Sequence, residues 1–182
     1  MESQAAGSGP SPGKGDRYYA ELWREWRPRA RAYARAFSGL TAEDREDIAD
    51  EAVARAWASR DRFEAGRRFA PWFLTIVRRL ALDTSRRRRE MAAEPATFDR
   101  REAPAGQVDP APEREAEAAF VRSFVEGLPE RERELASLVY GQDLGPAEAA
   151  RIVGIPAGTA KWRLHEIRQA LKKAWEREYG SR

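Results

Sequence analysis

Residues Phe69 to Arg89 read FAPWFLTIVRRLALDTSRRRR and join an apolar stripe to a basic end. The apolar spacing of three and one is typical of one buried helix face, and its members are Phe73, Ile76, Val77, Leu80 and Ala81. Six arginines and one aspartate give the stretch a net charge of +5. Aromatic rings beside arginines suit unstacked nucleic acid, because rings stack on bases and guanidinium groups neutralise phosphates. An amphipathic helix with a solvated basic end explains this stretch equally well.

The composition indicates a folded protein of modest size. The chain has 182 residues, of which 42% are hydrophobic and 35% are charged, and its net charge is only +3. These values fit one folded domain or two small ones, and they make the position of the charges more informative than their sum.

The residue types present also limit the chemistry that the chain can perform and its location in the cell. The sequence contains no cysteine and one histidine, which excludes disulfides and argues against a zinc site or a histidine-based triad. We therefore expect no enzyme activity, no catalytic residue, no metal and no cofactor. The sequence shows neither a membrane span nor a signal peptide, so we expect a cytoplasmic protein.

Helical patterns fill residues 16–89, the first predicted module. The apolar residues between Tyr18 and Phe37 recur at helical spacing, and Pro28 is expected to kink or divide that helix. Its predicted core residues are Leu22, Trp23, Trp26, Ala30, Tyr33, Ala34 and Phe37. Thr41 and Asp44 resemble a capping pair that begins a second helix, which continues to Trp57. Together with the stretch from Phe69, these helices predict a small bundle.

One face of the second helix is acidic. Residues 43–51 contain six carboxylates and one arginine. Asp47, Asp50 and Glu51 stand at positions i, i+3 and i+4, hence on one side. Their mutual repulsion indicates a cationic partner or a metal, although a solvated face near a helix N-terminus is an alternative. Magnesium is the weakest option, because no base or substrate clamp stands nearby.

The remaining segments divide the chain. Residues 1–15 are rich in Gly, Ser and Pro and are predicted to form a disordered tail. Residues 60–68 read as a charged loop with one exposed ring, Phe63. Residues 90–113 are acidic and Pro-rich, as in a flexible linker. A second module follows at residues 114–182.

The second module begins with a helical stripe and continues with a second helical segment. The stripe consists of Ala116, Phe120, Val121, Phe124 and Leu128. Pro129 is expected to be the first residue of the next helix, with Leu135, Leu138 and Val139 inward and Gly141 as its end.

Residues 145–175, GPAEAARIVGIPAGTAKWRLHEIRQALKKAW, have the layout of a helix-turn-helix. A short helix over Pro146–Val153 precedes Gly154, which tolerates a positive φ, and Pro156 begins the second helix. Ala160, Leu164, Ile167, Leu171 and Ala174 are predicted to face inward.

The outward face of that second helix is basic. A recognition helix contacts bases near its N-terminus and phosphates at its flanks. The candidates for bases are Lys161, Trp162 and His165, and those for phosphates are Arg163, Arg168, Lys172 and Lys173. Packing of Trp162 against a neighbouring helix, and a phosphate contact of His165, are the alternatives.

Together the two modules resemble the extracytoplasmic-function (ECF) group of the sigma-70 family of RNA polymerase sigma factors. The resemblance covers residues 18–175. It rests on REDIADEAVARAW with DRFEAGRRFAPWFLTIVRRLALDTSRRRR, and on LPERERELASLVYGQDLGPAEAARIVGIPAGTAKWRLHEIR. It implies an all-α fold with a region 2-like bundle and a region 4-like helix-turn-helix domain.

The resemblance also implies partners and sites. Asp47, Asp50 and Glu51 would bind the β′ clamp helices of core RNA polymerase, and region 4 would meet the β flap. The −10 promoter element would be bound by Phe63, Arg67, Arg68, Trp72, Arg78, Arg79 and Arg86. The −35 element would be bound by Thr159, Lys161, Trp162, Arg163, His165 and Arg168. An anti-sigma factor is a further candidate partner, while no small-molecule substrate and no direct membrane insertion are expected.

Several residues depart from the group's usual pattern. Asp50 stands where Gln is frequent, Arg79 where Asn is common, Trp162 in place of Ser and Glu166 in place of Arg. Three other functions remain open at this point: a helix-turn-helix regulator that works without polymerase, a sigma-like protein that binds only a regulatory partner, and a magnesium-dependent nuclease.

Overall fold

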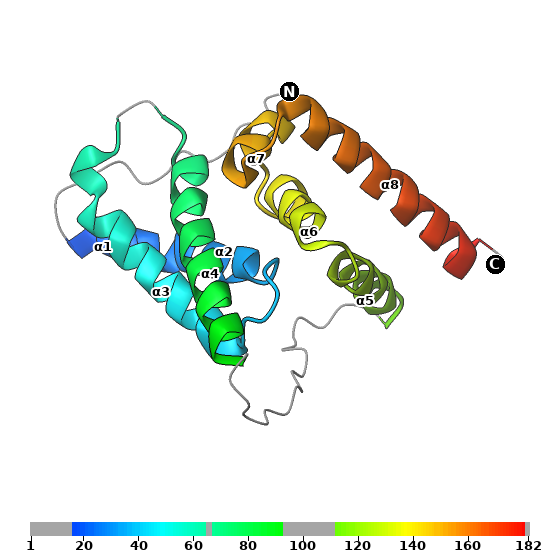
Figure 1. Ribbon diagram of the computed structural model, residues 1–182, viewed down its shortest axis with the longest axis horizontal. Coiled ribbons are helices and arrows are strands. Elements are labelled where there is room, and N and C mark those ends of the chain that lie inside the picture. The colour runs from blue at the N-terminus through cyan, green and yellow to red at the C-terminus, as the bar shows by residue number, and fades with distance from the viewer. Residues whose placement is uncertain (1–15, 65–66, 93–111, 181–182) are drawn as a thin grey trace.

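The computed structural model describes residues 16–64, 67–92 and 112–180, and these residues form helices and turns without a strand (Figure 1). This confirms the all-α prediction. The predicted tail at residues 1–15, and residues 93–111 of the predicted linker, lie outside the described residues.

The first bundle begins with a helix in three sections. Helix α1 (Asp16–Glu21) runs into a π-helical turn, η1 (Leu22–Trp26), and then into α2 (Arg27–Ala34). Pro28 lies in the first turn of α2, directly after the π-helical turn η1. The chain stays helical through Pro28, so this residue does not divide the helix; the irregularity is the π-helical turn η1 directly before α2.

One predicted core residue of this segment is wrong. Trp23 is 40% exposed, whereas Leu22 and Trp26 are fully buried. Leu22 and Trp26, four residues apart, take the inward face of the helix. The residue that follows Leu22 therefore points away from the core. Trp23 instead lies on the surface, with the Arg27 guanidinium 4.9 Å from its ring centroid.

Helices α3 (Ala42–Ala58) and α4 (Phe69–Ala92) complete the first bundle, joined by the short 3-10 helix η2 (Arg60–Arg62). Thr41 and Asp44 form the predicted capping box at the start of α3. The core contains an aromatic group in which the Trp26 ring meets Phe69 at 4.7 Å and Phe73 at 5.4 Å, both edge-on. These contacts place the start of α4 against η1.

The second bundle consists of α5 (Pro112–Glu126), α6 (Glu130–Ala136), the π-turn η3 (Ser137–Gly141), α7 (Pro146–Val153) and α8 (Ala157–Tyr179). Gly154 has φ 77° and ends α7, which confirms the predicted turn. Pro129 and Pro156 cap their helices instead of forming the first helical residue.

The stripe predicted for α5 is only half-buried, and Ala116 is exposed. Its ring Phe120 packs edge-on against Trp175 and Tyr179 of α8, each at 5.6 Å. The reason is that α5 lies at the edge of the bundle and covers the outer half of α8, with solvent on its other side.

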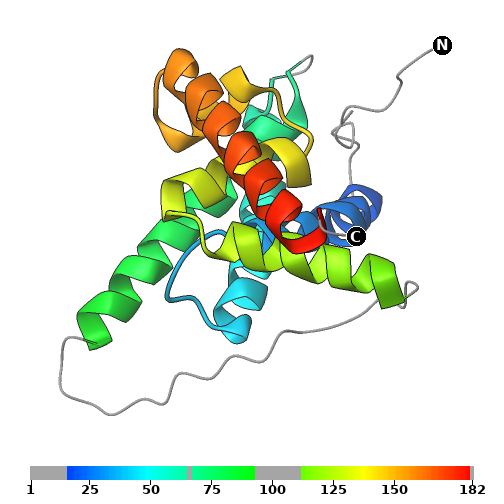
Figure 2. The same cartoon turned by 90° about the vertical axis from the view of Figure 1, so that its right-hand side faces the viewer.

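The two bundles pack directly against each other. Helix α7 lies against α4, and η3 lies against α2, as two views of the chain agree (Figures 1 and 2). Buried residues of both bundles belong to one hydrophobic cluster. Bundles this small bury too little apolar surface to be very stable alone, and sharing a core adds to the buried area. The sequence predicted the two bundles, but it did not reveal that they share a core.

Candidate nucleic-acid and polymerase interfaces

The acidic face of α3 is interleaved with arginines of α2. Glu46 lies 2.8 Å from both Arg27 and Arg31, and Arg27 also pairs with Asp50. The hydrogen bond from Arg31 is the main reason why the pKa of Glu46 lies below its usual value. Ion pairing of this kind keeps the carboxylate charged at neutral pH.

The three carboxylates predicted to bind polymerase differ in whether they form ion pairs within the chain. Asp50 pairs with Arg27, and Glu51 Oε1 lies 2.6 Å from Arg55 Nε one turn later. Asp47 is exposed and forms no ion pair among the described residues. Within the part of the chain that the structure describes, no three acidic or histidine side chains are arranged to hold a metal ion.

Three aromatic rings gather where the loop after η2 meets α4. Phe63 lies 5.5 Å from Phe69 and 5.1 Å from Trp72, measured between ring centroids. Phe63 was expected to be exposed, but it is half-buried, because the neighbouring rings at the start of α4 give it an apolar surface to cover. Phe63 and Trp72 remain partly accessible and line a groove.

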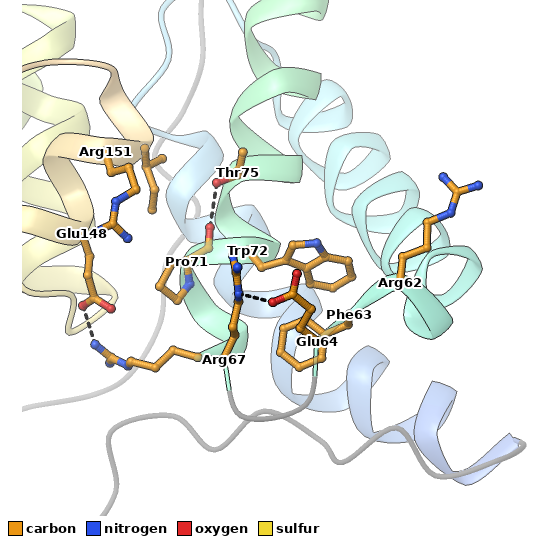
Figure 3. A pocket seen from close by; sticks show the side chains of 11 residues that line it. Arg62, Phe63, Glu64, Arg67, Pro71, Trp72, Thr75, Glu148 and Arg151 are labelled. Atoms are coloured by element: carbon orange, nitrogen blue, oxygen red, sulfur yellow. Dashed lines mark hydrogen bonds and ion pairs between the residues drawn. The ribbon is translucent and has the colours of Figure 1, made fainter.

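That groove has a volume of about 520 Å³ and lies between the two bundles. In Figure 3, Phe63 and Trp72 form one side, and Glu148 and Arg151 of α7 face them from the other. Four arginines line it: Arg62, Arg67, Arg68 and Arg151. Arg67 pairs with Glu64 at 2.6 Å, while Arg68 pairs with Glu148 across the groove.

The remaining candidates for the −10 element lie along α4 and differ in exposure. Arg78 donates through Nε to Glu134 at 2.6 Å, and its side chain is only 21% exposed. Arg79 is exposed. Arg86 is 71% exposed, and its nearest carboxylates stand 3.9 and 4.0 Å away.

Glu134 is one of the few charged residues buried in the described part of the chain. Burial raises the pKa of Glu134 above its usual value, and the neighbouring Arg78 acts in the opposite direction. The Tyr33 hydroxyl is buried nearby without a hydrogen bond of normal geometry. Burial, and then the charge of Glu134, raise the pKa of Tyr33 well above its usual value.

Helix α8, the predicted recognition helix, presents most of the residues predicted to bind DNA to solvent. Trp162 is 62% exposed, so the alternative that it packs against a neighbouring helix is wrong. Lys161, His165 and Arg168 are also exposed, and Thr159 is half-buried. Arg163 differs, because its guanidinium lies 3.3 Å from Glu132 of α6.

The sequence did not reveal the acidic partners of Arg68 and Arg78. Glu134 and Glu148 belong to the second bundle, 56 and 80 residues from Arg78 and Arg68. Glu134 lies within the run PERERE, where alternating charges normally indicate a solvated surface. The alternating charges therefore did not distinguish it from Glu130 and Glu132, which are only half-buried.

Family profiles match both bundles. The profile described as Sigma-70 region 2 matches residues 22–91, and that described as Sigma-70, region 4 matches residues 125–173. Among the described residues, no helix combines the length and the apolar character that crossing a bilayer requires.

Curated relatives agree with these matches. The chain is 31% identical to the ECF RNA polymerase sigma factor EcfG of Rhodopseudomonas palustris, over 79% of this chain and 77% of that one. It is 30% identical to the ECF RNA polymerase sigma factor SigW of Bacillus subtilis, over 70% of this chain and 73% of that one.

Solved structures of similar fold include the sigma factor RpoE in complex with the anti-sigma factor NepR from Bartonella quintana. The TM-score is 0.64 at 25% identity, over 86% of this chain and 95% of that one. CnrH in complex with the cytosolic domain of CnrY has the same fold, with a TM-score of 0.62 at 21% identity, over 91% of this chain and 92% of that one.

A region 2 bundle packed on a region 4 helix-turn-helix defines a transcription initiation factor. The chain belongs to the sigma-70 family of RNA polymerase sigma factors, in its ECF group.

Proposed function

We propose that this sigma factor uses three binding surfaces. The acidic face of α3 binds core polymerase. The aromatic groove and outer side of α4 bind the −10 element, and the outer face of α8 binds the −35 element. The observation that carries this proposal is the separation of charge. Carboxylates dominate one face of α3, while exposed cations dominate α8 and the end of α4. Opposite charges suit a basic protein partner and a polyanion respectively.

The polymerase surface is centred on Asp47, with Asp50 and Glu51 beside it. Asp47 is the free carboxylate of the three, so it can pair with a partner without first breaking an internal contact. Asp50 and Glu51 would exchange an internal arginine for one on the polymerase. We therefore assign Asp47 the largest share of the electrostatic contribution.

The −10 surface combines stacking and charge. Phe63 and Trp72 are partly accessible rings at a groove lined with arginines, as binding of a melted strand requires. On α8, Trp162 and Lys161 stand where a recognition helix contacts bases. A sigma factor acts where polymerase copies DNA, so we place its action in the cytoplasm, where an anti-sigma factor could reach it.

The test of the polymerase surface is binding of the full-length chain to purified core RNA polymerase. Neutralising the acidic face with Asp47→Asn, Asp50→Asn and Glu51→Gln should weaken binding by about tenfold or more, as expected for lost charge pairs at an interface. The matched control changes three exposed carboxylates elsewhere, Glu117→Gln, Glu126→Gln and Glu178→Gln. Equal affinities of the two triple variants would contradict the proposal.

A further inference from the structure

Three aromatic rings gather on the surface of the first bundle, where α1 and η1 meet the end of α3. The Tyr19 ring centroid lies 6.1 Å from that of Trp23 and 5.7 Å from that of Trp57. Tyr19 is 36% exposed and Trp23 is 40% exposed, while Trp57 is half-buried. We call these three residues the tryptophan patch. Large aromatic side chains that lie together on a surface are typical of a binding site.

The local backbone keeps Trp23 at the surface. It lies in the π-helical turn η1, whose first and last residues, Leu22 and Trp26, are both fully buried. A π-helical turn within a longer helix is rare and frequently occurs at functional sites. The turn holds its two end residues in the core and leaves Trp23 accessible to a partner.

Arginine side chains cover part of the rings and join the tryptophan patch to the acidic face of α3. The guanidinium carbon of Arg27 lies 4.9 Å from the Trp23 ring centroid, and that of Arg60 lies 4.2 Å from the Trp57 centroid. Arg27 also pairs with Asp50. The patch and the acidic face are therefore continuous. Because cation–π contacts hold the rings in place, less side-chain freedom is lost when a partner binds.

The charges around the tryptophan patch favour a protein partner over DNA. Arg24 and Glu25, which follow Trp23, are both exposed, and Asp61 beside Arg60 is 84% exposed. A surface for DNA is dominated by cations, since each phosphate carries a negative charge. Protein interfaces instead combine aromatic rings and arginines with a polar rim. Continuity with the acidic face indicates that one protein covers both surfaces.

We infer that the tryptophan patch is the apolar anchor of the core polymerase interface, with Trp23 at its centre and Arg27 positioning it beside the acidic face. The inference rests on the proposed role of that face. A few buried aromatic side chains supply much of the affinity of a typical interface, whereas charged groups mainly give orientation and fast association. The partner must then present apolar side chains next to its cations.

Truncation of the central ring tests this inference in the full-length chain. Trp23→Ala should weaken binding to purified core RNA polymerase by about tenfold or more, as expected for an interface hot spot. Trp23→Phe keeps an aromatic ring and should retain most of the affinity. The matched control is Met91→Ala, which shortens another exposed large side chain of the first bundle. Equal affinities of Trp23→Ala and Met91→Ala would overturn the inference.

Salt distinguishes an apolar anchor from an electrostatic contact. Salt screens exposed charges, whereas the burial of apolar surface does not depend on charge. Trp23→Ala should therefore lose affinity by a similar factor at low and at high salt. The triple variant Asp47→Asn, Asp50→Asn and Glu51→Gln should lose most at low salt. If the loss in Trp23→Ala disappears at high salt, the ring acts only through the charge of Arg27, and the inference is wrong.

The outcomes separate this inference from the proposed function. If the acidic triple variant binds polymerase weakly but Trp23→Ala binds normally, the anchor is wrong and the acidic face still stands. If neither variant loses affinity, the proposed polymerase surface is wrong as well. If Trp23→Ala instead weakens binding of a single-stranded oligonucleotide, with polymerase binding unchanged, the patch binds nucleic acid and the inference is overturned. Urea unfolding checks that Trp23→Ala is folded, and Tyr19→Ala provides the same test if it is not.

Discussion

Arg88 donates through Nη2 to the Asp44 carboxylate at 2.8 Å, and the same carboxylate accepts the Thr41 amide at 2.7 Å. One side chain thus joins the beginning of α3 to the last turns of α4. Burial alone would raise the pKa of Asp44, but the hydrogen bonds from Arg88 and Thr41 outweigh it and lower the pKa below its usual value.

This contact predicts an acid-sensitive contribution to stability. Because the pKa of Asp44 is lower in the folded chain, its ionised form stabilises the fold above the unfolded pKa of about 4. That contribution is lost as the pH falls through the folded pKa. At neutral pH, Asp44→Asn should lower the free energy of unfolding by about 1 kcal/mol, because it weakens the capping box with Thr41 and removes the ion pair with Arg88.

Urea unfolding at neutral and at acid pH measures this effect. The gap between Asp44→Asn and the unaltered chain should narrow in acid. Asp61, whose side chain is 84% exposed, provides the control Asp61→Asn, which should change little at either pH. A gap of constant size would mean that ionisation of Asp44 is not what stabilises the fold.

Two arginines of the same basic run should behave oppositely. Arg86 is 71% exposed, whereas Arg88 is tied to Asp44. We expect Arg86→Gln to weaken binding of single-stranded DNA while leaving the unfolding free energy within about 0.5 kcal/mol. Arg88→Gln should chiefly reduce stability. Anisotropy measures DNA binding by both variants, and urea unfolding measures their stability. Equal losses of stability in the two variants would contradict this expectation.

Trp162 should contribute to DNA binding and not to the stability of the fold. Its side chain is 62% exposed, so Trp162→Ala should leave thermal unfolding nearly unchanged. Loss of one base contact should weaken binding to a −35 duplex by roughly 1–2 kcal/mol. The control is Trp23→Ala, which removes an exposed tryptophan of the first bundle. If Trp162→Ala and Trp23→Ala lose similar affinity for the duplex, α8 does not recognise its bases.

Salt should weaken the DNA contribution steeply. About five phosphate contacts predict a slope of roughly −4 to −5 when the logarithm of the binding constant is plotted against that of salt concentration. Titrations of promoter DNA with the full chain at several salt concentrations give this slope directly. A flat response would show that arginine–phosphate contacts contribute little.

The helices could be predicted well because the sequence near each helix contains the residues that begin or end it. The Thr41–Asp44 cap, the turn at Gly154 and the apolar spacing of α4 each depend on residues only a few positions apart. The helix-turn-helix was predicted to within one residue for this reason. Trp23 was misplaced because the segment offered more aromatic rings than one helix face can bury.

The packing between the bundles could not be predicted in this way. Arg78 and Arg68 were recognised as cations, but their partners Glu134 and Glu148 are distant in sequence and lie in charged or polar surroundings. Which carboxylate meets which arginine depends on how two preformed surfaces fit. A basic run likewise does not reveal that Arg88 pairs with Asp44 of another helix, while Arg86 has only long contacts to carboxylates of its own helix.

Run-off transcription from a genomic DNA library, with purified core RNA polymerase, tests the central claim most directly. With this chain added, the polymerase should start at a defined set of promoters, and the variant with Asp47→Asn, Asp50→Asn and Glu51→Gln should lose those starts. Unchanged transcripts with and without the chain, or undiminished starts with the triple variant, would contradict the assignment of α3 as the polymerase surface of a sigma factor.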